Sequence, residues 1–122
     1  MPLLILCAAV TVAAIVANVY AATADFARGD LALTNSIKVG VPTSWLPVLG
    51  TLKTAGALGL LLGLLGVPYI GVAAAIGLVL FFLGAIGFHL RAHEHHFIIT
   101  TVGYFLLAAA ALVASIAWQV VR

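Results

Sequence analysis

Three polar side chains lie within otherwise apolar stretches of the sequence, and they are its best candidates for chemistry. Lys53 is a single cation inside the apolar segment 45–66, Asn18 lies inside another such segment, and His89 ends a third. An ionisable residue within a membrane segment is a functional candidate because burying its charge in hydrocarbon is unfavourable. Lys53 could pair inside a helix bundle and contact an anionic ligand or a quinone carbonyl. The alternative is a lysine whose long side chain reaches the membrane surface and binds lipid phosphate.

The histidines form a second candidate set. All four histidines of the chain lie within residues 89–96. The spacing of His89 and His93 lets two rings on one helix share a divalent ion. Glu94 would add a carboxylate to such a site. The sequence has no HExxH pattern, and Cys7 is its only cysteine. Interfacial histidines that contact water or lipid headgroups are therefore the preferred interpretation, and a metal site at His89 and His93 is the alternative.

Other catalytic patterns are missing from the sequence. No nucleophile elbow surrounds its serines, and no glycine-rich loop is present to hold phosphate. The net charge of +2 rests on five cations and three anions, too few for a nucleic-acid surface. We therefore expect no catalytic residues, no tightly defined cofactor beyond a quinone or lipid, and no nucleic-acid partner.

Apolar helices must position these polar side chains. The chain is 66% hydrophobic and 7% charged, whereas a soluble domain has about 25% charged residues. A helix of about 20 apolar residues crosses the hydrocarbon core of a bilayer. Four segments have that length: 3–24, 45–66, 69–90 and 97–121. The sequence therefore predicts an all-α fold, in which a single domain is a bundle of four transmembrane helices.

Small residues predict where these helices pack, because membrane helices associate through close contact. The residues expected at the contacts are Ala13 and Ala17 in the first segment, Gly56, Gly59 and Gly63 in the second, and Gly77, Gly84 and Gly87 in the third. At 100° per residue, His89 and His93 would then point away from the glycine face of their helix.

Polar membrane residues concentrate in one leaflet and come from all four segments: Asn18, Lys53, His89, Thr100 and Thr101. Asp25 and Glu94 are the carboxylates at the rim of this leaflet. We expect a polar pocket that opens toward loops 25–44 and 91–96. The alternative is that these groups simply form hydrogen bonds between helices.

The basic residues indicate an orientation. Arg28, Lys38 and Arg91 lie in the two loops on one side, whereas Arg122 alone lies on the other side. The positive-inside rule therefore favours cytoplasmic loops in a multi-pass protein of the cell membrane, of the kind found in prokaryotic plasma membranes.

Four short stretches carry a family resemblance: VGVP at 39–42, WLPVLG at 45–50, KTAGALGL at 53–60 and GAIGFHLR at 84–91. With these stretches, the region from about 38 to 93 resembles the DoxX-like family of small four-helix membrane proteins. Lys53 and His89 match recurrent polar positions of that family. Many relatives carry a carboxylate in the second span, where this sequence has a lysine.

The resemblance implies a role in sulfur or thiol redox metabolism, as in the small membrane subunit of a thiosulfate:quinone oxidoreductase, or in assembly and cargo handling. Three functions stay open at this point. The first is an accessory or scaffolding subunit, which contacts lipid and either other membrane subunits or copies of itself. The second is a quinone-binding component of a redox system. The third is a small oligomeric transporter or lipid-handling protein.

Overall fold

Each apolar segment forms one long helix in the computed structural model, which describes residues 2–27, 34, 37–38, 40, 42–67, 69–93 and 98–121. The helices are α1 (Pro2–Ala27), α3 (Leu46–Leu64), α4 (Ile70–Arg91) and α5 (Ile98–Val121), and a short 3-10 helix, η1 (Thr43–Trp45), precedes α3. All four long helices have the length and apolar composition needed to cross a membrane. The predicted all-α fold with four membrane-spanning helices is therefore confirmed.

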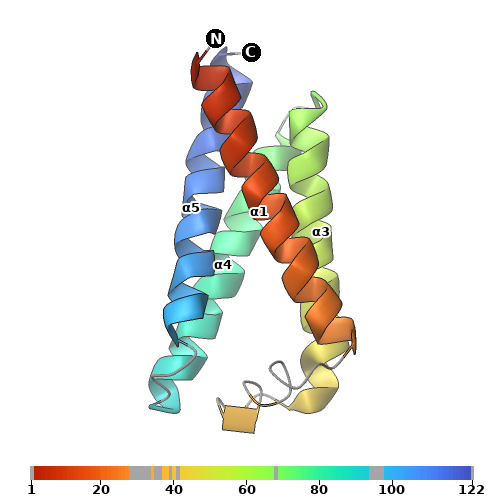
Figure 1. Ribbon diagram of the computed structural model, residues 1–122, viewed down its shortest axis with the longest axis vertical. Coiled ribbons are helices and arrows are strands. Elements are labelled where there is room, and N and C mark those ends of the chain that lie inside the picture. Colours follow the sequence, from red (N-terminus) through yellow and green to blue (C-terminus); the bar gives the residue numbers. More distant parts are fainter. Residues whose placement is uncertain are drawn as a thin grey trace.

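The helices pack around a square (Figure 1). α1 and α4 each pack against both α3 and α5, while α3 and α5 barely touch across the centre. The two chain ends and the turn between α3 and α4 lie at one end of the bundle, which we call the terminus side. The C-terminal ends of α1 and α4 lie at the opposite end, the loop side. α1 crosses the bundle obliquely, from α5 at the terminus side to the start of α3 at the loop side.

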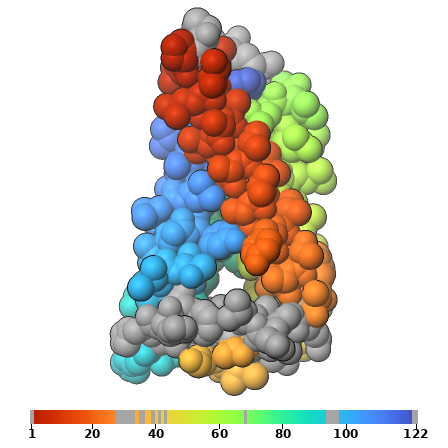
Figure 2. Space-filling model, in the orientation of Figure 1, coloured from red at the N-terminus to blue at the C-terminus, as the bar shows by residue number. Residues whose placement is uncertain are grey.

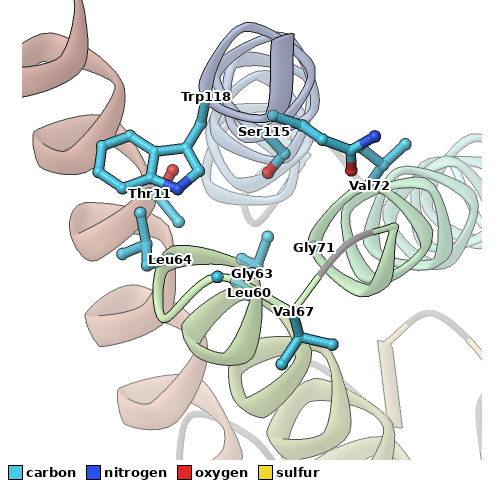
Figure 3. A pocket seen from close by; sticks show the side chains of 11 residues that line it. Thr11, Leu60, Gly63, Leu64, Val67, Gly71, Val72, Ser115 and Trp118 are labelled. Atoms are coloured by element: carbon cyan, nitrogen blue, oxygen red, sulfur yellow. The ribbon is translucent and has the colours of Figure 1, made fainter. Parts of the chain in front are cut away.

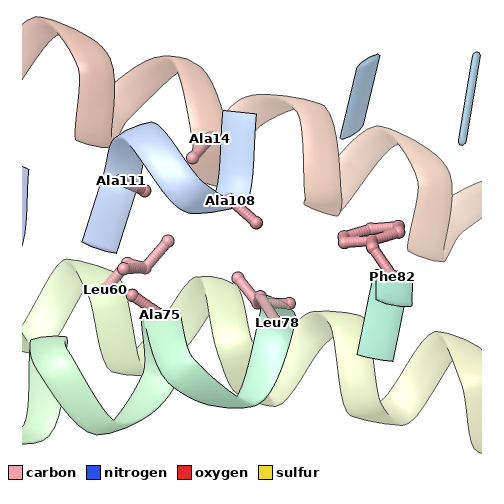
Figure 4. Close-up of a cluster of buried hydrophobic side chains, with 7 residues drawn as sticks. All are labelled: Ala14, Leu60, Ala75, Leu78, Phe82, Ala108 and Ala111. Atoms are coloured by element: carbon pink, nitrogen blue, oxygen red, sulfur yellow. The ribbon is translucent and has the colours of Figure 1, made fainter. Parts of the chain in front are cut away.

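The centre of the bundle is filled by small residues together with a few larger apolar ones (Figure 4). The buried cluster consists of Ala14, Leu60, Ala75, Leu78, Phe82, Ala108 and Ala111. All four helices contribute to it. The alanines let the helices approach closely, and the three larger side chains fill the remaining space.

Three glycines lie in the contact between α3 and α4. A Cβ atom built on Gly63 would stand 2.7 Å from the Cα of Gly71, and one on Gly56 would stand 2.5 Å from the side chain of Leu78. Gly59 is similarly close to a side chain of α4. A side chain at Gly63 would meet backbone and push the two helices apart, whereas one at Gly56 or Gly59 would meet a side chain of α4, so these glycines let α3 and α4 approach closely.

The other glycines of α4 differ from the sequence expectation. Gly77, Gly84 and Gly87 are exposed, and a Cβ on each would meet no described atom within 4 Å. The buried residues of α4 are Gly71, Ala75, Leu78, Phe82 and His89. At 100° per residue these fall within an arc of about 60°, opposite the three glycines. The larger Leu78 and Phe82 side chains fill the space between helices, and they set the inward face.

α1 also turns a different stripe inward from the one expected. Ala13 is exposed and Ala17 is only half-buried. The buried residues are Cys7, Thr11, Ala14, Asn18, Ala22 and Asp25. Three of these are polar and recur every seven residues, which is close to two helical turns. The inward face is chosen because hydrocarbon outside the bundle offers polar groups no hydrogen-bond partner.

Candidate functional site

Lys53 and Asp25 form an ion pair between α3 and α1. Lys53 Nζ donates to Asp25 Oδ2 at 2.7 Å, and the two side chains are 13% and 8% exposed. The sequence interpretation placed Asp25 outside the first span, which it ended at residue 24, but α1 continues to Ala27. The added turn keeps the backbone hydrogen bonds within the helix and brings the carboxylate to Lys53. The charge of Lys53 is therefore compensated inside the bundle.

The close approach of α1 and α3 at Gly50 explains this pairing. A Cβ on Gly50 would stand 3.2 Å from the carbonyl oxygen of Ala22 and equally close to the Phe26 ring. Lys53 follows Gly50 by about one turn of helix, and Asp25 follows Ala22 in the same way. The glycine thus brings the two backbones near enough for the long and the short side chain to meet.

Aromatic rings from α4 and α5 border this region. Lys53 Nζ lies 5.5 Å from the centroid of the Phe81 ring, within the range of a cation–π interaction. The Tyr104 ring stacks on Phe82 with centroids 5.4 Å apart. The Tyr104 hydroxyl donates to the Ala17 carbonyl at 3.1 Å and so links α5 to α1.

Asn18 is buried on the same face of α1 as Asp25. Its side-chain Nδ2 donates to the Ala14 carbonyl at 2.8 Å, one turn earlier in the helix. Its Oδ1 is buried and has no hydrogen-bond partner in the described part of the chain. Asn18 therefore presents an unused acceptor inside the bundle.

His89 connects α4 to α5 at the loop side. Its Nδ1 lies 2.8 Å from the Ala85 carbonyl, to which it donates, and Thr101 Oγ1 lies 3.4 Å from its Nε2. With Nδ1 protonated, Nε2 is the acceptor for the Thr101 hydroxyl. The ring is buried, with only 3% of the residue exposed. Both ring nitrogens are therefore engaged in contacts within the protein.

His89 and His93, the pair considered for a metal site, do not lie on one continuous helix. α4 ends at Arg91, and His93 is exposed beyond that end with a φ of 54°. Glu94, His95 and His96 lie outside the described residues. Within the described ranges, no group of three or more histidine, cysteine, aspartate or glutamate side chains is placed to hold a metal ion.

The polar residues make separate links between helices. Lys53 joins α3 to α1, Tyr104 joins α5 to α1, and His89 joins α4 to α5. Figure 2 shows the surface hollowed between the loop-side halves of α1 and α5. A shallow groove on this seam is lined by Ala17, Thr100, Gly103, Tyr104 and Leu107. Chemically, the arrangement can hold the helices together; Asn18 does not line the groove, and its Oδ1 stays buried.

The sequence interpretation named Asp25 only as a carboxylate at the rim of the expected pocket, without pairing it with Lys53, and it missed Tyr104. A signal for Asp25 was present, because a lysine within an apolar span requires a countercharge and the chain has only three acidic residues. The seven-residue spacing from Asn18 also places Asp25 on the same helix face. Tyr104 offered a weaker signal, as a hydroxyl inside an apolar segment.

The family comparison covers this region in full. The model of the DoxX-like family matches residues 9–117, which include parts of all four helices and every site residue described above. No curated protein and no solved structure matches the chain.

Proposed function

The chain belongs to the DoxX-like family, and we propose that it acts as a non-catalytic accessory subunit of a membrane complex. The observation that carries this proposal is the outward glycine face of α4, formed by Gly77, Gly84 and Gly87. All three are exposed, with no described atom within 4 Å of a Cβ position. Exposed glycine backbone lets a second helix approach closely within the membrane. The occupant that fits is an apolar transmembrane helix of another subunit.

The side chains next to this glycine face support an apolar partner. Ile76, Leu80 and Leu83 are 45%, 62% and 53% exposed. They are apolar side chains on the same outward side of α4 as the glycines. A partner helix with small or branched apolar residues would contact this face through van der Waals packing, which is the main source of helix association in lipid.

The loop-side polar residues support the non-catalytic part of the proposal. Lys53 is compensated by Asp25, and both ring nitrogens of His89 are engaged within the bundle. General acid–base catalysis requires a titratable group that can reach a substrate proton. These contacts instead connect neighbouring helices, as expected for a rigid scaffold.

The test compares two substitutions that add the same bulk to different helices. Gly84→Leu places a large side chain on the glycine face of α4, whereas Gly103→Leu does so at an equally open position of α5. Each tagged protein is purified from its native membrane in mild detergent and weighed intact by native mass spectrometry. We expect wild type and Gly103→Leu to retain, in fixed stoichiometry, a bound protein other than this chain. Gly84→Leu should lose that protein.

Two results would contradict the accessory role. The first is that none of the three preparations contains a different bound protein; a partner that all three retain would instead show that it binds elsewhere than the glycine face. The second is a complex of identical copies that dissociates in Gly84→Leu, since this would make the glycine face a contact for self-association.

A second candidate function is quinone binding, which the unused acceptor of Asn18 favours. Asn18 Oδ1 is buried without a described partner and does not itself line the groove between α1 and α5, so a quinol in that groove would have to displace Ala17 or Tyr104 to reach it. The hydroxyl of a reduced quinone would donate to this oxygen. We expect Asn18→Leu to weaken quinol binding about tenfold, while Thr11→Val, on the same helix face, leaves it unchanged. Equal affinities in both variants and in wild type would exclude this function.

A further inference from the structure

A cavity of ≈ 230 Å³ lies at the terminus side of the bundle, at the level of the turn between α3 and α4 (Figure 3). Residues of α1, α3, α4 and α5 form its walls. Gly63 and Gly71 line it where their backbones are in contact, with a Cβ on Gly71 standing 3.1 Å from the Cα of Gly63. Because neither residue has a side chain, space is left beside the two backbones.

Two hydrogen-bond donors face this cavity without a described acceptor. Trp118 Nε1 is buried and has no hydrogen-bond partner among the described residues. Ser115 is 9% exposed, and its hydroxyl takes part in none of the hydrogen bonds found among the described residues. Figure 3 shows the Trp118 ring nitrogen and the Ser115 hydroxyl both turned toward the space beside Gly63. A buried donor without an acceptor is unfavourable, so Trp118 Nε1 calls for an acceptor, and the Ser115 hydroxyl can donate to the same group.

The surrounding backbone adds further donors. Gly71 and Val72, in the first turn of α4, line the cavity. The first amides of a helix have no acceptor within it and lie at its partially positive end. Gln119 Oε1 accepts the Tyr69 backbone amide at 2.8 Å, which leaves the Gln119 amino group as another donor at the cavity wall. The cavity therefore offers several donors, although the C-terminal end of α3 at Leu64 also lines it and presents carbonyl acceptors, and its described lining contains no charged side chain.

Apart from Thr11, whose hydroxyl donates to the Cys7 carbonyl, the remaining side chains of the wall are apolar, and the cavity reaches the surface. Leu60, Leu64 and Val72 lie inside, and Val67, 45% exposed, marks its outer edge. The volume is below the about 300 to 1,000 Å³ typical of sites for drug-sized ligands. It suits a small polar group with the first few carbons of a chain that continues along the lipid-facing surface.

We propose that this cavity binds the carbonyl end of an acyl chain, with Trp118 Nε1 and Ser115 Oγ donating to its oxygen. The acyl oxygen can be the carboxylate of a free fatty acid or the ester of a membrane lipid, because both present the same acceptor. The site does not depend on a partner at the glycine face of α4, which points away from the bundle.

Trp118 is itself the reporter for the test. The chain has two tryptophans, so Trp45→Phe leaves Trp118 as the single tryptophan, which can be excited selectively. This protein, in detergent, is titrated with a brominated long-chain fatty acid and with its methyl ester, since bromine quenches a neighbouring indole. We expect saturable quenching, and Ser115→Ala should raise the half-saturating concentration about fivefold, the effect of one neutral hydrogen bond. The matched control is Ser44→Ala, at an exposed position of η1 on the loop side.

The two ligands distinguish the two sources of the acyl oxygen. Tighter binding of the acid identifies a fatty-acid site, and equal or tighter binding of the ester identifies an acyl-lipid site. Quenching that rises without saturation, or that is the same in Ser115→Ala and Ser44→Ala, would overturn the proposal.

A second measurement does not rely on fluorescence. Trp118→Phe keeps an aromatic ring but removes the Nε1 donor, and the acyl ligand retained after purification is counted by native mass spectrometry. We expect both Trp118→Phe and Ser115→Ala to retain less than wild type. Equal retention in all three proteins, or a density map with only water in the cavity, would contradict acyl binding.

Discussion

Lys53 Nζ lies 2.7 Å from Asp25 Oδ2, although the two residues are 28 positions apart in the sequence. One is carried by α3 and the other by the last turn of α1. Both side chains are largely buried. An uncompensated charge inside the bundle would be strongly unfavourable. The pair is therefore a specific link between two helices, and each charge makes the other tolerable.

We expect removal of either charge alone to destabilise the protein. Lys53→Met leaves Asp25 without its countercharge, and Asp25→Leu does the same to Lys53. Breaking a buried ion pair on one side costs about 3 to 5 kcal/mol in soluble proteins. The double variant should recover most of this loss, since two apolar side chains can replace a buried pair at little net cost. Thermal unfolding of all four proteins in one detergent measures the coupling.

This expectation would be contradicted if the double variant were no more stable than the less stable of the two single variants. It would mean that Lys53 and Asp25 contribute through separate contacts, such as the Phe81 ring near the ammonium group.

The sequence predicted the membrane helices well because their length and composition follow directly from bilayer thickness. It also singled out Lys53, since a cation stands out in an apolar span. It did not place Asp25 correctly, because a charged residue next to an apolar segment looks like the start of a loop. Whether a helix continues for another turn depends on tertiary contacts, here the countercharge that α3 provides.

Asn18→Leu is expected to leave the stability of the isolated protein unchanged or to raise it by about 1 kcal/mol. The substitution is close in volume and removes Oδ1, which is buried without a described partner, at the cost of the Nδ2 hydrogen bond to the Ala14 carbonyl. Thr11→Val serves as the control, because it removes a hydroxyl that donates to the Cys7 carbonyl. Chemical unfolding in detergent compares the two. A loss of more than about 1 kcal/mol in Asn18→Leu alone would show that Oδ1 has a structural partner.

Zinc is expected to give no stabilisation that depends on His89. A metal ion would have to displace the Ala85 carbonyl from one ring nitrogen or the Thr101 hydroxyl from the other. A bound ion stabilises a folded protein in proportion to the logarithm of its concentration above Kd. Melting temperatures are therefore measured with increasing zinc in wild type, His89→Ala and His93→Ala. A zinc-dependent rise in wild type that both substitutions abolish would contradict this expectation.

The glycines show a second limit of sequence reasoning. Periodicity correctly separated two faces of α4, one with Gly77, Gly84 and Gly87 and one with His89. It could not decide which face is inward, because in a membrane both sides of a helix are apolar. That choice depends on how Leu78 and Phe82 fit against the other three helices, which is a property of the assembled bundle.

Substitution by alanine should change the stability of the protein differently at a glycine between α3 and α4 and at a glycine on the outward face of α4. Gly63→Ala places a methyl group 2.7 Å from the Gly71 backbone, which cannot move aside as a flexible side chain would. We expect it to destabilise the protein by about 1 to 3 kcal/mol. Gly77→Ala meets no described atom within 4 Å and should be neutral or stabilising by up to about 1 kcal/mol, because alanine favours helix. Unfolding of the purified single subunit measures both, and an equal loss in the two variants would show that the outward face of α4 is already packed within one chain.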